Sequence, residues 1–428
     1  MKILQINKFF FLKGGSERHF FDLSELLSVK GHQVSIWSTK HLHNFFFPNQ
    51  ENFAKFIDFS KKDSFLKEIK KLKNIFWNKE AKKKLEKIIK YKKPDVVHLH
   101  NIFSHFSPSI IFAIKKYNIP IILTLHDYKF FCPNYKFFSN NNVCFNCLKN
   151  KNYKSCVYKK CIKNSYIKSF VGYLEGKWHK DFLKMAEKID IFLAPSLFIK
   201  KKAIEWGIPK EKVIHLPNFI DVKFEGNPST SSSLNSRAVP RLRRGLPSDS
   251  TYLLYFGRLS EEKGVEFLIK SFLNISDEFP EWKLKIAGDG PEIKNLKKAF
   301  QENEQIEFLG RKNSKELNKI ISKAYLTIVP SLWPENFPYS ILESNVLAIP
   351  VLASKIGGLT ELIKHEKTGL LFKSGNRDDL ENKIIWSIRN PKKIRKIGEV
   401  AQKEVFDKYN SEKYYKRIIK IYERIKIY

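Results

Sequence analysis

Several features of other protein classes are missing from this 428-residue chain. It has no uninterrupted apolar run of about 18 residues, which a membrane-spanning helix would need. Gln5 and Asn7 interrupt its apolar beginning and no small-residue cleavage site follows, so the first residues predict a buried strand rather than a signal peptide. We therefore expect a cytoplasmic protein.

Acidic residues are also scarce. The chain has 44 Asp and Glu against 78 Lys and Arg, a formal charge of +34. Such a charge is typical of a protein that binds nucleic acid or an anionic membrane surface. It can also result from a compositional bias toward Lys, Asn, Ile and Phe. Neither a zinc finger of the Cys2His2 type nor an RNA-recognition aromatic pair is present. We expect bias together with attraction to the inner membrane face, and no nucleic-acid partner.

Cysteine is rare and confined to one segment, between Cys132 and Cys161. Cys144, Cys147, Cys156 and Cys161 have a spacing that suits a structural zinc ion. Reduced, buried thiols are the alternative, because disulfides are disfavoured in a reducing cytoplasm.

The length suits two domains, and strand-like runs alternate with helix-like runs in both halves. This alternation predicts an α/β protein with two parallel sheets, each covered by helices on both faces. The predicted strands are 3–6, 34–37, 96–99, 121–125, 191–194 and 213–216, then 252–256, 282–287, 306–309, 325–330, 349–353 and 370–372.

Composition sets the expected boundaries. We expect a first domain over 1–222, which includes the cysteine-rich segment, and a second over 251–410. Between them, 223–250 is rich in Ser, Pro and Arg, which predicts a disordered insertion. The basic segment 411–428 has helical periodicity, as does the segment 61–91, which presents either a solvated face or a surface for membrane or substrate.

Two motifs in the second half follow strand-like runs and precede helix-like runs. The first is Gly-Arg-Leu-x3-Lys-Gly, with Arg258 and Lys263, and the second is Ala-Gly-Asp-Gly-Pro, with Gly288. Cations on a strand-to-helix loop of an open parallel sheet are placed to bind a diphosphate.

Glu335 and Glu343 lie eight positions apart, at the start of a helix predicted from about Pro338. A helix N-terminus attracts anions, and carboxylates beside it can hold sugar or ribose hydroxyls. The alternative is a pair of solvated helix charges.

The first half offers glycines and histidines at strand ends. Gly14 and Gly15 follow the first strand, where they form either a tight turn or a close approach to a ligand. His126 ends a predicted strand at the edge where such sheets bind ligands. His98 and His100 share one face of another strand, which suits packing better than an acceptor site.

Together these motifs resemble the retaining, nucleotide-sugar-dependent glycosyltransferases of family four, and the resemblance runs from Met1 to about Lys420. It rests on the Glu-x7-Glu pair, the two glycine loops, Pro217-Asn218-Phe219-Ile220-Asp221 and His126-Asp127. It implies the GT-B fold, in which two Rossmann-like doubly wound domains face each other across a cleft and a C-terminal helix crosses back to the first domain.

The resemblance also implies roles. It places His126 and Glu335 at the transferred sugar, Arg258 and Lys263 at the leaving diphosphate, and Glu343 at the ribose. Further donor contacts are implied for Gly14, Gly15, Gly288, Asn336 and Phe337. No Asp-x-Asp motif occurs in a suitable place, so we expect no cofactor for catalysis. Pro338 departs from the glycine of many relatives and removes one backbone donor.

The function implied is transfer of a sugar from a UDP- or GDP-sugar to a saccharide or lipid-linked acceptor of the cell envelope, at the inner membrane face. Phe9-Phe10-Phe11 and Phe45-Phe46-Phe47 are either interfacial anchors or buried packing residues. Two alternatives remain: a basic nucleic-acid-binding protein with a Rossmann-like core, and another GT-B enzyme such as a nucleotide-sugar epimerase.

Overall fold

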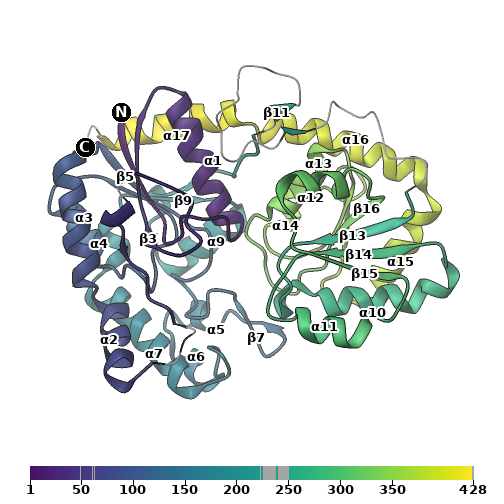
Figure 1. Ribbon diagram of the computed structural model, residues 1–428, viewed down its shortest axis with the longest axis horizontal. Helices are drawn as coiled ribbons and strands as arrows, with labels where there is room; N and C mark the ends of the chain where they lie inside the picture. Colours follow the sequence, from purple (N-terminus) through teal and green to yellow (C-terminus); the bar gives the residue numbers. More distant parts are fainter. Residues whose placement is uncertain are drawn as a thin grey trace. The chain divides into compact units, whose positions relative to one another are not determined.

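The computed structural model describes residues 1–48, 50–59, 61, 63–221, 223–224, 238–239 and 250–426. The chain divides into two compact units (Figure 1). Unit 1 contains Met1–Phe137, Phe145–Asn218 and Tyr414–Tyr428, and unit 2 contains Phe138–Cys144 and Phe219–Lys413.

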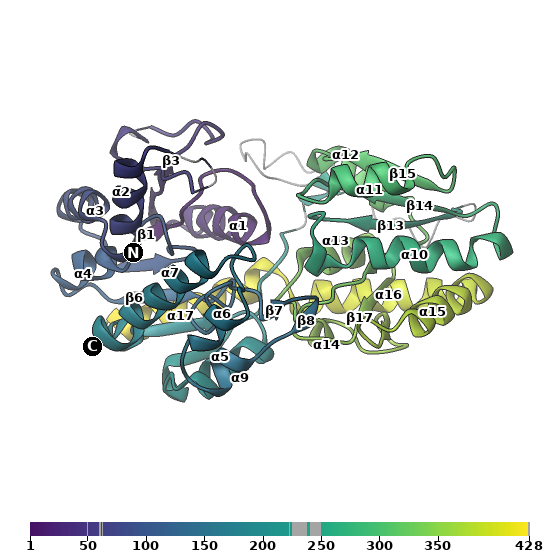
Figure 2. The same cartoon turned by 90° about the horizontal axis from the view of Figure 1, so that it is seen from below.

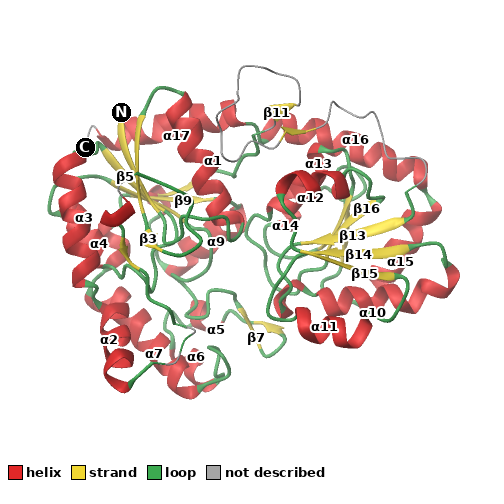
Figure 3. Ribbon diagram, in the orientation of Figure 1, coloured by secondary structure: helices red, strands yellow, loops and turns green. Residues whose placement is uncertain are grey.

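Unit 1 is built on a six-stranded parallel sheet of order β10-β9-β6-β5-β1-β2 (Figure 3). Its strands are β1 (Lys2–Ile6), β2 (Gln33–Trp37), β5 (Val96–Leu99), β6 (Ile121–Thr124), β9 (Ile191–Ala194) and β10 (Val213–His215). Every residue of β5, β6 and β9 is buried, as expected of parallel strands that are covered on both faces.

Helices and short strands complete unit 1. The helices are α1 (Gly15–Val29), α2 (Phe65–Phe76), α3 (Lys79–Lys92), α4 (Ser109–Lys115), α5 (Asn146–Lys149), α6 (Lys154–Tyr158), α7 (Tyr166–Lys177), α8 (Met185–Lys188), α9 (Leu197–Trp206) and α17 (Ser411–Lys426). The π-helical turn η2 (Trp178–Phe182) extends α7, and β3 (Thr39–Lys40) pairs with β4 (Ala54–Lys55). The short helical turns are η1 (Gln50–Asn52) and η3 (Lys210–Lys212).

The C-terminal helix α17 packs on unit 1, beside α1 in Figure 1. Tyr414 and Tyr422 lie in its buried stripe, and the Tyr414 hydroxyl lies 3.2 Å from Nε2 of His19 on α1. At the far end of α17, Lys426 pairs with Asp95 at 3.1 Å. Thus the buried stripe of α17 belongs to the core of the first unit.

Unit 2 repeats the architecture, with a parallel sheet of order β15-β14-β13-β16-β17-β18 (Figure 2). Its strands are β13 (Tyr252–Phe256), β14 (Lys283–Ala287), β15 (Ile306–Gly310), β16 (Leu326–Val329), β17 (Val351–Ser354) and β18 (Leu370–Phe372). The helices are α10 (Val265–Ile275), α11 (Ile293–Phe300), α12 (Ser314–Ile321), α13 (Tyr339–Val346), α14 (Leu359–Leu362), α15 (Arg377–Arg389) and α16 (Pro391–Lys408). Short pairs and turns are β7 (Phe138–Ser139) with β8 (Asn142–Val143), β11 (Lys223–Phe224) with β12 (Ala238–Val239), η4 (Glu261–Lys263) and η5 (Ser276–Glu278).

Local chemistry explains several boundaries. A capping box starts α12, in which Asn313 accepts from the backbone N–H of Glu316 and the Glu316 side chain accepts in return. Ser196 caps α9 by accepting from Ile199, and Gly207, with φ at +114°, ends it. These caps satisfy helix-end groups that would otherwise lack partners.

The predicted α/β class and all twelve predicted sheet strands are confirmed, to within two residues at each end. The basic segment 61–91 forms two helices, α2 and α3. Most of the predicted insertion over 223–250 lies outside the described residues. Phe9 and Phe10 are buried, so for them the packing alternative is correct, whereas Phe46 is 86% exposed. In the part of the chain that the structure describes, no helix is both long and apolar enough to cross a membrane.

Candidate functional site

The predicted donor residues of unit 2 gather where the strand order reverses. From β13 the chain continues to β14 and β15 on one side, and from β16 it continues to β17 and β18 on the other. Open α/β sheets bind ligands at the carboxyl ends of the strands that flank such a reversal. The loop after β13 carries Arg258 and Lys263, and the loop after β16 carries Glu335.

A side-chain contact joins these two loops. The Lys263 ammonium donates to Oε1 of Glu335 at 2.6 Å, and the Ser331 hydroxyl donates to the same oxygen at 2.6 Å. Glu335 is only 4% exposed, and the Lys263 ammonium lies 5.4 Å from the centre of the Trp333 ring. Arg258 is exposed, and its carbonyl accepts from the Tyr255 hydroxyl at 2.7 Å.

Close backbone packing fixes the loops to one another. Gly264 has φ at +68°, and a Cβ on it would lie 2.1 Å from the Pro330 carbonyl oxygen. Gly288 has φ at +153°, and a Cβ there would lie 1.8 Å from the Gly257 carbonyl oxygen. Only glycine fits such positions, so the backbones of the loops after β13, β14 and β16 are in close contact.

The helix predicted after Glu335 begins at Tyr339 as α13, with Pro338 in extended conformation just before it. Glu343 lies within the helix and is 8% exposed, and Asn336 is also buried. Two buried carboxylates contradict the alternative of solvated helix charges. Phe337 packs within unit 2, with its ring 5.8 Å from that of Tyr409.

In unit 1 the strand order reverses between β1 and β5, and histidines collect there. His98 lies on β5, His100 follows that strand and His126 follows β6, while His19 comes from α1. The His98 and His100 rings stack with centroids 4.5 Å apart, and those of His100 and His126 are 5.2 Å apart. We call these four residues the histidine cluster.

Hydrogen bonds assign the tautomers within the cluster. Nε2 of His100 lies 2.7 Å from the Gln5 amide oxygen, which can only accept, so this nitrogen carries the proton. Nδ1 of a neutral His100 therefore accepts from Nε2 of His126, at 2.9 Å. Nδ1 of His98 lies 2.7 Å from the Tyr422 hydroxyl, and Nε2 of His98 lies 2.8 Å from the Thr124 hydroxyl.

Burial keeps these rings neutral. It lowers the pKa of His98 and of His126 to about 3, and it lowers the pKa values of His19 and His100 well below the ordinary range. Near neutral pH, His126 therefore acts as a neutral hydrogen-bonding group and not as a cation. The neighbouring Asp127 carboxyl also has a raised pKa, chiefly because it is buried.

The remaining predicted residues are placed as follows. Gly14 and Gly15 are exposed at the start of α1, and Glu17 in its first turn is buried, which raises the pKa of that carboxyl. Among the described residues, no group of three or more His, Cys, Asp or Glu side chains is arranged to hold a metal ion. Zinc binding by Cys144, Cys147, Cys156 and Cys161 stays a prediction. Cys144 falls in unit 2, and the other three fall in unit 1.

Sequence reasoning missed several partners. Ser331 and Trp333 belong to the same loop as Glu335, and their place between a strand and the Glu-x7-Glu pair was the available signal. Gln5 and Tyr422 complete the histidine cluster from positions 417 residues apart. No local pattern marks that pair.

Two family models match the chain. Residues 13–224 match "Glycosyltransferase Family 4" and residues 240–404 match "Glycosyl transferases group 1". Curated relatives include an uncharacterized glycosyltransferase of Methanocaldococcus jannaschii, 27% identical over 57% of this chain and 62% of its own length. Another is N-acetyl-alpha-D-glucosaminyl L-malate synthase of Bacillus anthracis, 25% identical over 56% of this chain and 60% of its own length. The chain thus spans about three fifths of these relatives.

Solved structures are similar over almost the whole chain. Anabaena HepE, in complex with UDP and glucose, has a TM-score of 0.62 at 17% identity and covers 99% of this chain and 100% of its own. The pneumococcal O-GlcNAc transferase GtfA, in complex with UDP and GlcNAc, has a TM-score of 0.66 at 11% identity, with 99% of each chain covered. These similarities confirm the predicted two-domain GT-B fold.

Proposed function

Because the chain belongs to the group 1 glycosyltransferases, we propose that it transfers a sugar from a nucleoside diphosphate sugar to a saccharide or lipid-linked acceptor. The observation that carries the proposal is the contact between Lys263 and Glu335 at the strand reversal of unit 2. It places a cation and a buried carboxylate side by side, and these are the groups that a sugar diphosphate needs.

The pair suggests how a donor is held. A diphosphate beside Lys263 competes with Glu335 for the ammonium, which frees Oε1 of Glu335 to accept from a sugar hydroxyl. The exposed Arg258 adds a second cation with a planar, forked geometry that suits phosphate oxygens. Glu343 is proposed to accept from the ribose, and His126 to contact the sugar.

For the reaction we propose retention of the anomeric configuration. The bond between C1 of the sugar and the diphosphate oxygen breaks, and the acceptor oxygen bonds to C1 on the same face. The acceptor proton passes to the leaving diphosphate, so no protein base is needed. Arg258 and Lys263 stabilise the charge that develops on that group, and we propose no metal cofactor for this step.

The test is release of nucleoside diphosphate from UDP-glucose, UDP-N-acetylglucosamine and GDP-mannose by the full chain, with saccharide acceptors and with water alone. UDP donors come first, because HepE and GtfA hold UDP. We expect turnover of at least one donor, and a loss of about 100-fold or more in Glu335→Gln. The matched control is Glu307→Gln, which alters another Lys–Glu pair of unit 2, at 2.9 Å from Lys285. Absence of turnover for all donors, or equal loss in both variants, contradicts the proposal.

We further propose that unit 1 contacts the anionic inner membrane face. Helix α7 exposes a stripe of apolar side chains at helical spacing, with Ile167 78%, Phe170 50% and Leu174 37% exposed. Exposed lysines flank them, as in helices that lie in a membrane interface.

Sedimentation with vesicles tests the membrane contact. Ile167→Ser with Phe170→Ser should reduce binding to anionic phosphatidylglycerol vesicles several-fold, because each change removes apolar surface from the interface. Leu197→Ser, at a side chain 53% exposed on α9, is the control and should bind as the parent does. Equal binding by all three proteins would argue against α7 as the contact.

A further inference from the structure

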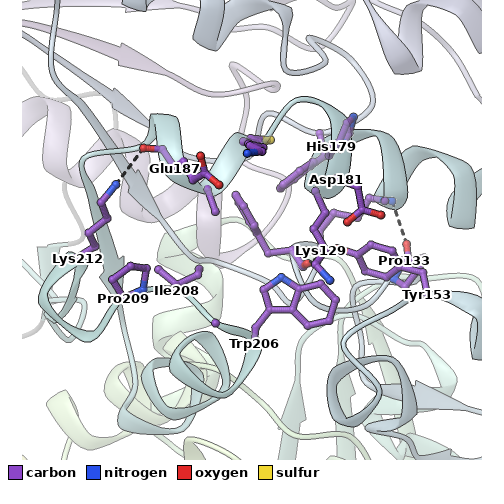
Figure 4. A pocket seen from close by; sticks show the side chains of 18 of the residues that line it. Lys129, Pro133, Tyr153, His179, Asp181, Glu187, Trp206, Ile208, Pro209 and Lys212 are labelled. Carbon is purple, nitrogen blue, oxygen red and sulfur yellow. Dashed lines mark hydrogen bonds between the residues drawn. The ribbon is translucent and has the colours of Figure 1, made fainter.

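Unit 1 contains a cavity of about 600 Å³ that includes none of the predicted donor residues. Its lining comes from the loops after β5 and β6, from α7, η2 and α8, and from the turn after α9. Figure 4 shows Lys212 and Pro209 at one end of it and Tyr153 and Pro133 at the other. The volume is within the range of small-molecule sites.

Aromatic rings supply much of the wall. Phe103 and Phe130 pack edge to face at 5.3 Å, and Tyr153 and Trp206 pack at 5.1 Å. Gly176 on α7 allows Tyr153 to approach, since a Cβ on this glycine would lie 2.6 Å from the ring. Flat rings of this kind suit a ligand with apolar faces.

The cavity also has a buried, unsatisfied acceptor. His179 is 6% exposed and lines the cavity, yet its Nε2 has no hydrogen-bond partner. The ring bonds the backbone of Ile75, and burial lowers the pKa of His179 to about 4. The nitrogen that faces the backbone carbonyl carries the proton, so Nε2 of the neutral ring is left with a lone pair. A buried lone pair of this kind calls for a ligand hydroxyl or N–H.

Two lysines of the lining, Lys129 and Lys212, are already engaged in hydrogen bonds. Lys129 donates to the Glu175 carboxylate at 2.7 Å and to the Pro133 carbonyl at 3.0 Å. Lys212 donates to two backbone carbonyls, those of Glu187 and Ile189. An anionic ligand at either of these lysines would therefore have to break existing bonds. A purely apolar ligand would leave His179 unsatisfied.

We propose that this cavity is an accessory binding site for a neutral saccharide, distinct from the donor-binding loops of unit 2. A pyranose has apolar C–H faces that stack on Trp206 and Tyr153. One of its hydroxyls donates to Nε2 of His179, which is shielded in this structure, after the ring turns toward the cavity. Lys129 has a third N–H available for a hydroxyl oxygen. As an anchor for a sugar unit of the acceptor, the site rests on the proposed transfer function, but its saccharide binding can be measured without turnover.

The experiment titrates the full-length protein with glucose, galactose, N-acetylglucosamine, maltose and cellobiose, by saturation-transfer NMR and calorimetry without nucleotide. Ala186→Phe fills the cavity from its half-buried wall, and His179→Leu removes the lone pair. Ala299→Phe places the same ring on the exposed surface of α11 in unit 2, as the matched control. Thermal melts establish that each variant is folded.

We expect at least one saccharide to bind with a dissociation constant of roughly 10 mM or tighter. Ala186→Phe and His179→Leu should each weaken it about 10-fold or more, whereas Ala299→Phe and Glu335→Ala should leave it unchanged. Absence of binding, equal binding in Ala186→Phe, or loss in Glu335→Ala alone overturns the proposal. Displacement of the saccharide by inorganic phosphate would also overturn it, because the site would then be anionic. Donor turnover by the parent would survive any of these failures.

Discussion

The candidate residues of unit 2 are held together by backbone, and those of unit 1 by side-chain rings. In unit 2, glycines let three loops touch, and the Lys263–Glu335 contact joins two of them. In unit 1, four neutral histidines, a glutamine and two tyrosines satisfy one another in a buried network. We infer that unit 2 should be sensitive to added atoms and unit 1 to added protons.

The largest effect is expected for Gly288→Ala. The new Cβ would lie 1.8 Å from the Gly257 carbonyl oxygen at a φ of +153°, so the loop must move. We expect a loss of about 3 kcal/mol or more in the free energy of unfolding of unit 2. Urea unfolding measures it.

Gly375→Ala is the matched control in the same unit. Gly375 also has a positive φ, +74°, but a Cβ there meets nothing within 4 Å. The free energy of unfolding should therefore fall only by the conformational penalty of a positive φ, about 1 kcal/mol. Equal losses in the two variants would mean that backbone contact does not hold the loops together.

The second effect is a dependence of the stability of unit 1 on pH. The folded pKa of His98 is about 3, against about 6.5 in an unfolded chain, so below pH 6.5 the unfolded state binds more protons. The contribution of His98 to the free energy of unfolding is complete above pH 6.5 and declines toward pH 3, by about 1.4 kcal/mol per pH unit. Urea unfolding between pH 7 and pH 4 should show a shallower slope in His98→Leu than in the parent.

The carboxyls of Glu17 and Asp127 act in the opposite direction, because burial raises their pKa values. Both are present in the parent and in His98→Leu, so their effect cancels in the difference between the two slopes. Identical slopes would show that His98 is not held neutral by the fold.

The smallest effect concerns the attachment of α17. Tyr422→Phe removes the hydroxyl that lies 2.7 Å from Nδ1 of buried His98, and leaves that nitrogen unpaired. We expect a loss of about 1–2 kcal/mol in the free energy of unfolding. Tyr415→Phe removes a half-buried hydroxyl, 2.9 Å from Nε2 of His32, where water can replace it, and should cost about 0.5 kcal/mol or less. A larger loss in Tyr415→Phe would place the attachment elsewhere on the helix.

The same contrast explains what the sequence could predict. The donor loops of unit 2 are contiguous motifs, so Arg258, Lys263 and Glu335 could be named from their spacing, and the reversal of strand order places their loops together. The histidine cluster is assembled by register between distant strands and by α17. His98 and His100 could be placed on one face, but neither Gln5 nor Tyr422 could be assigned to them without the pairing of β1 with β5.

The zinc prediction from the cysteine spacing stays a prediction for a related reason. A spacing of two and four residues suits zinc only when the backbone turns all the ligands toward one point, and the spacing alone does not show whether it does. The cavity beside His179 had no sequence signal, because its lining is gathered from several separate segments between Phe103 and Lys212.

The central claim is that Lys263 and Glu335 form the donor site, and donor binding tests it most directly. Calorimetry should measure the affinity of the parent, Lys263→Ala and Lys285→Ala for the nucleotide sugar that the parent turns over. Lys285 is the control, because it forms a different Lys–Glu contact of unit 2. We predict that Lys263→Ala weakens binding by about 10-fold or more while Lys285→Ala binds as the parent does. Unchanged affinity in Lys263→Ala would contradict the account.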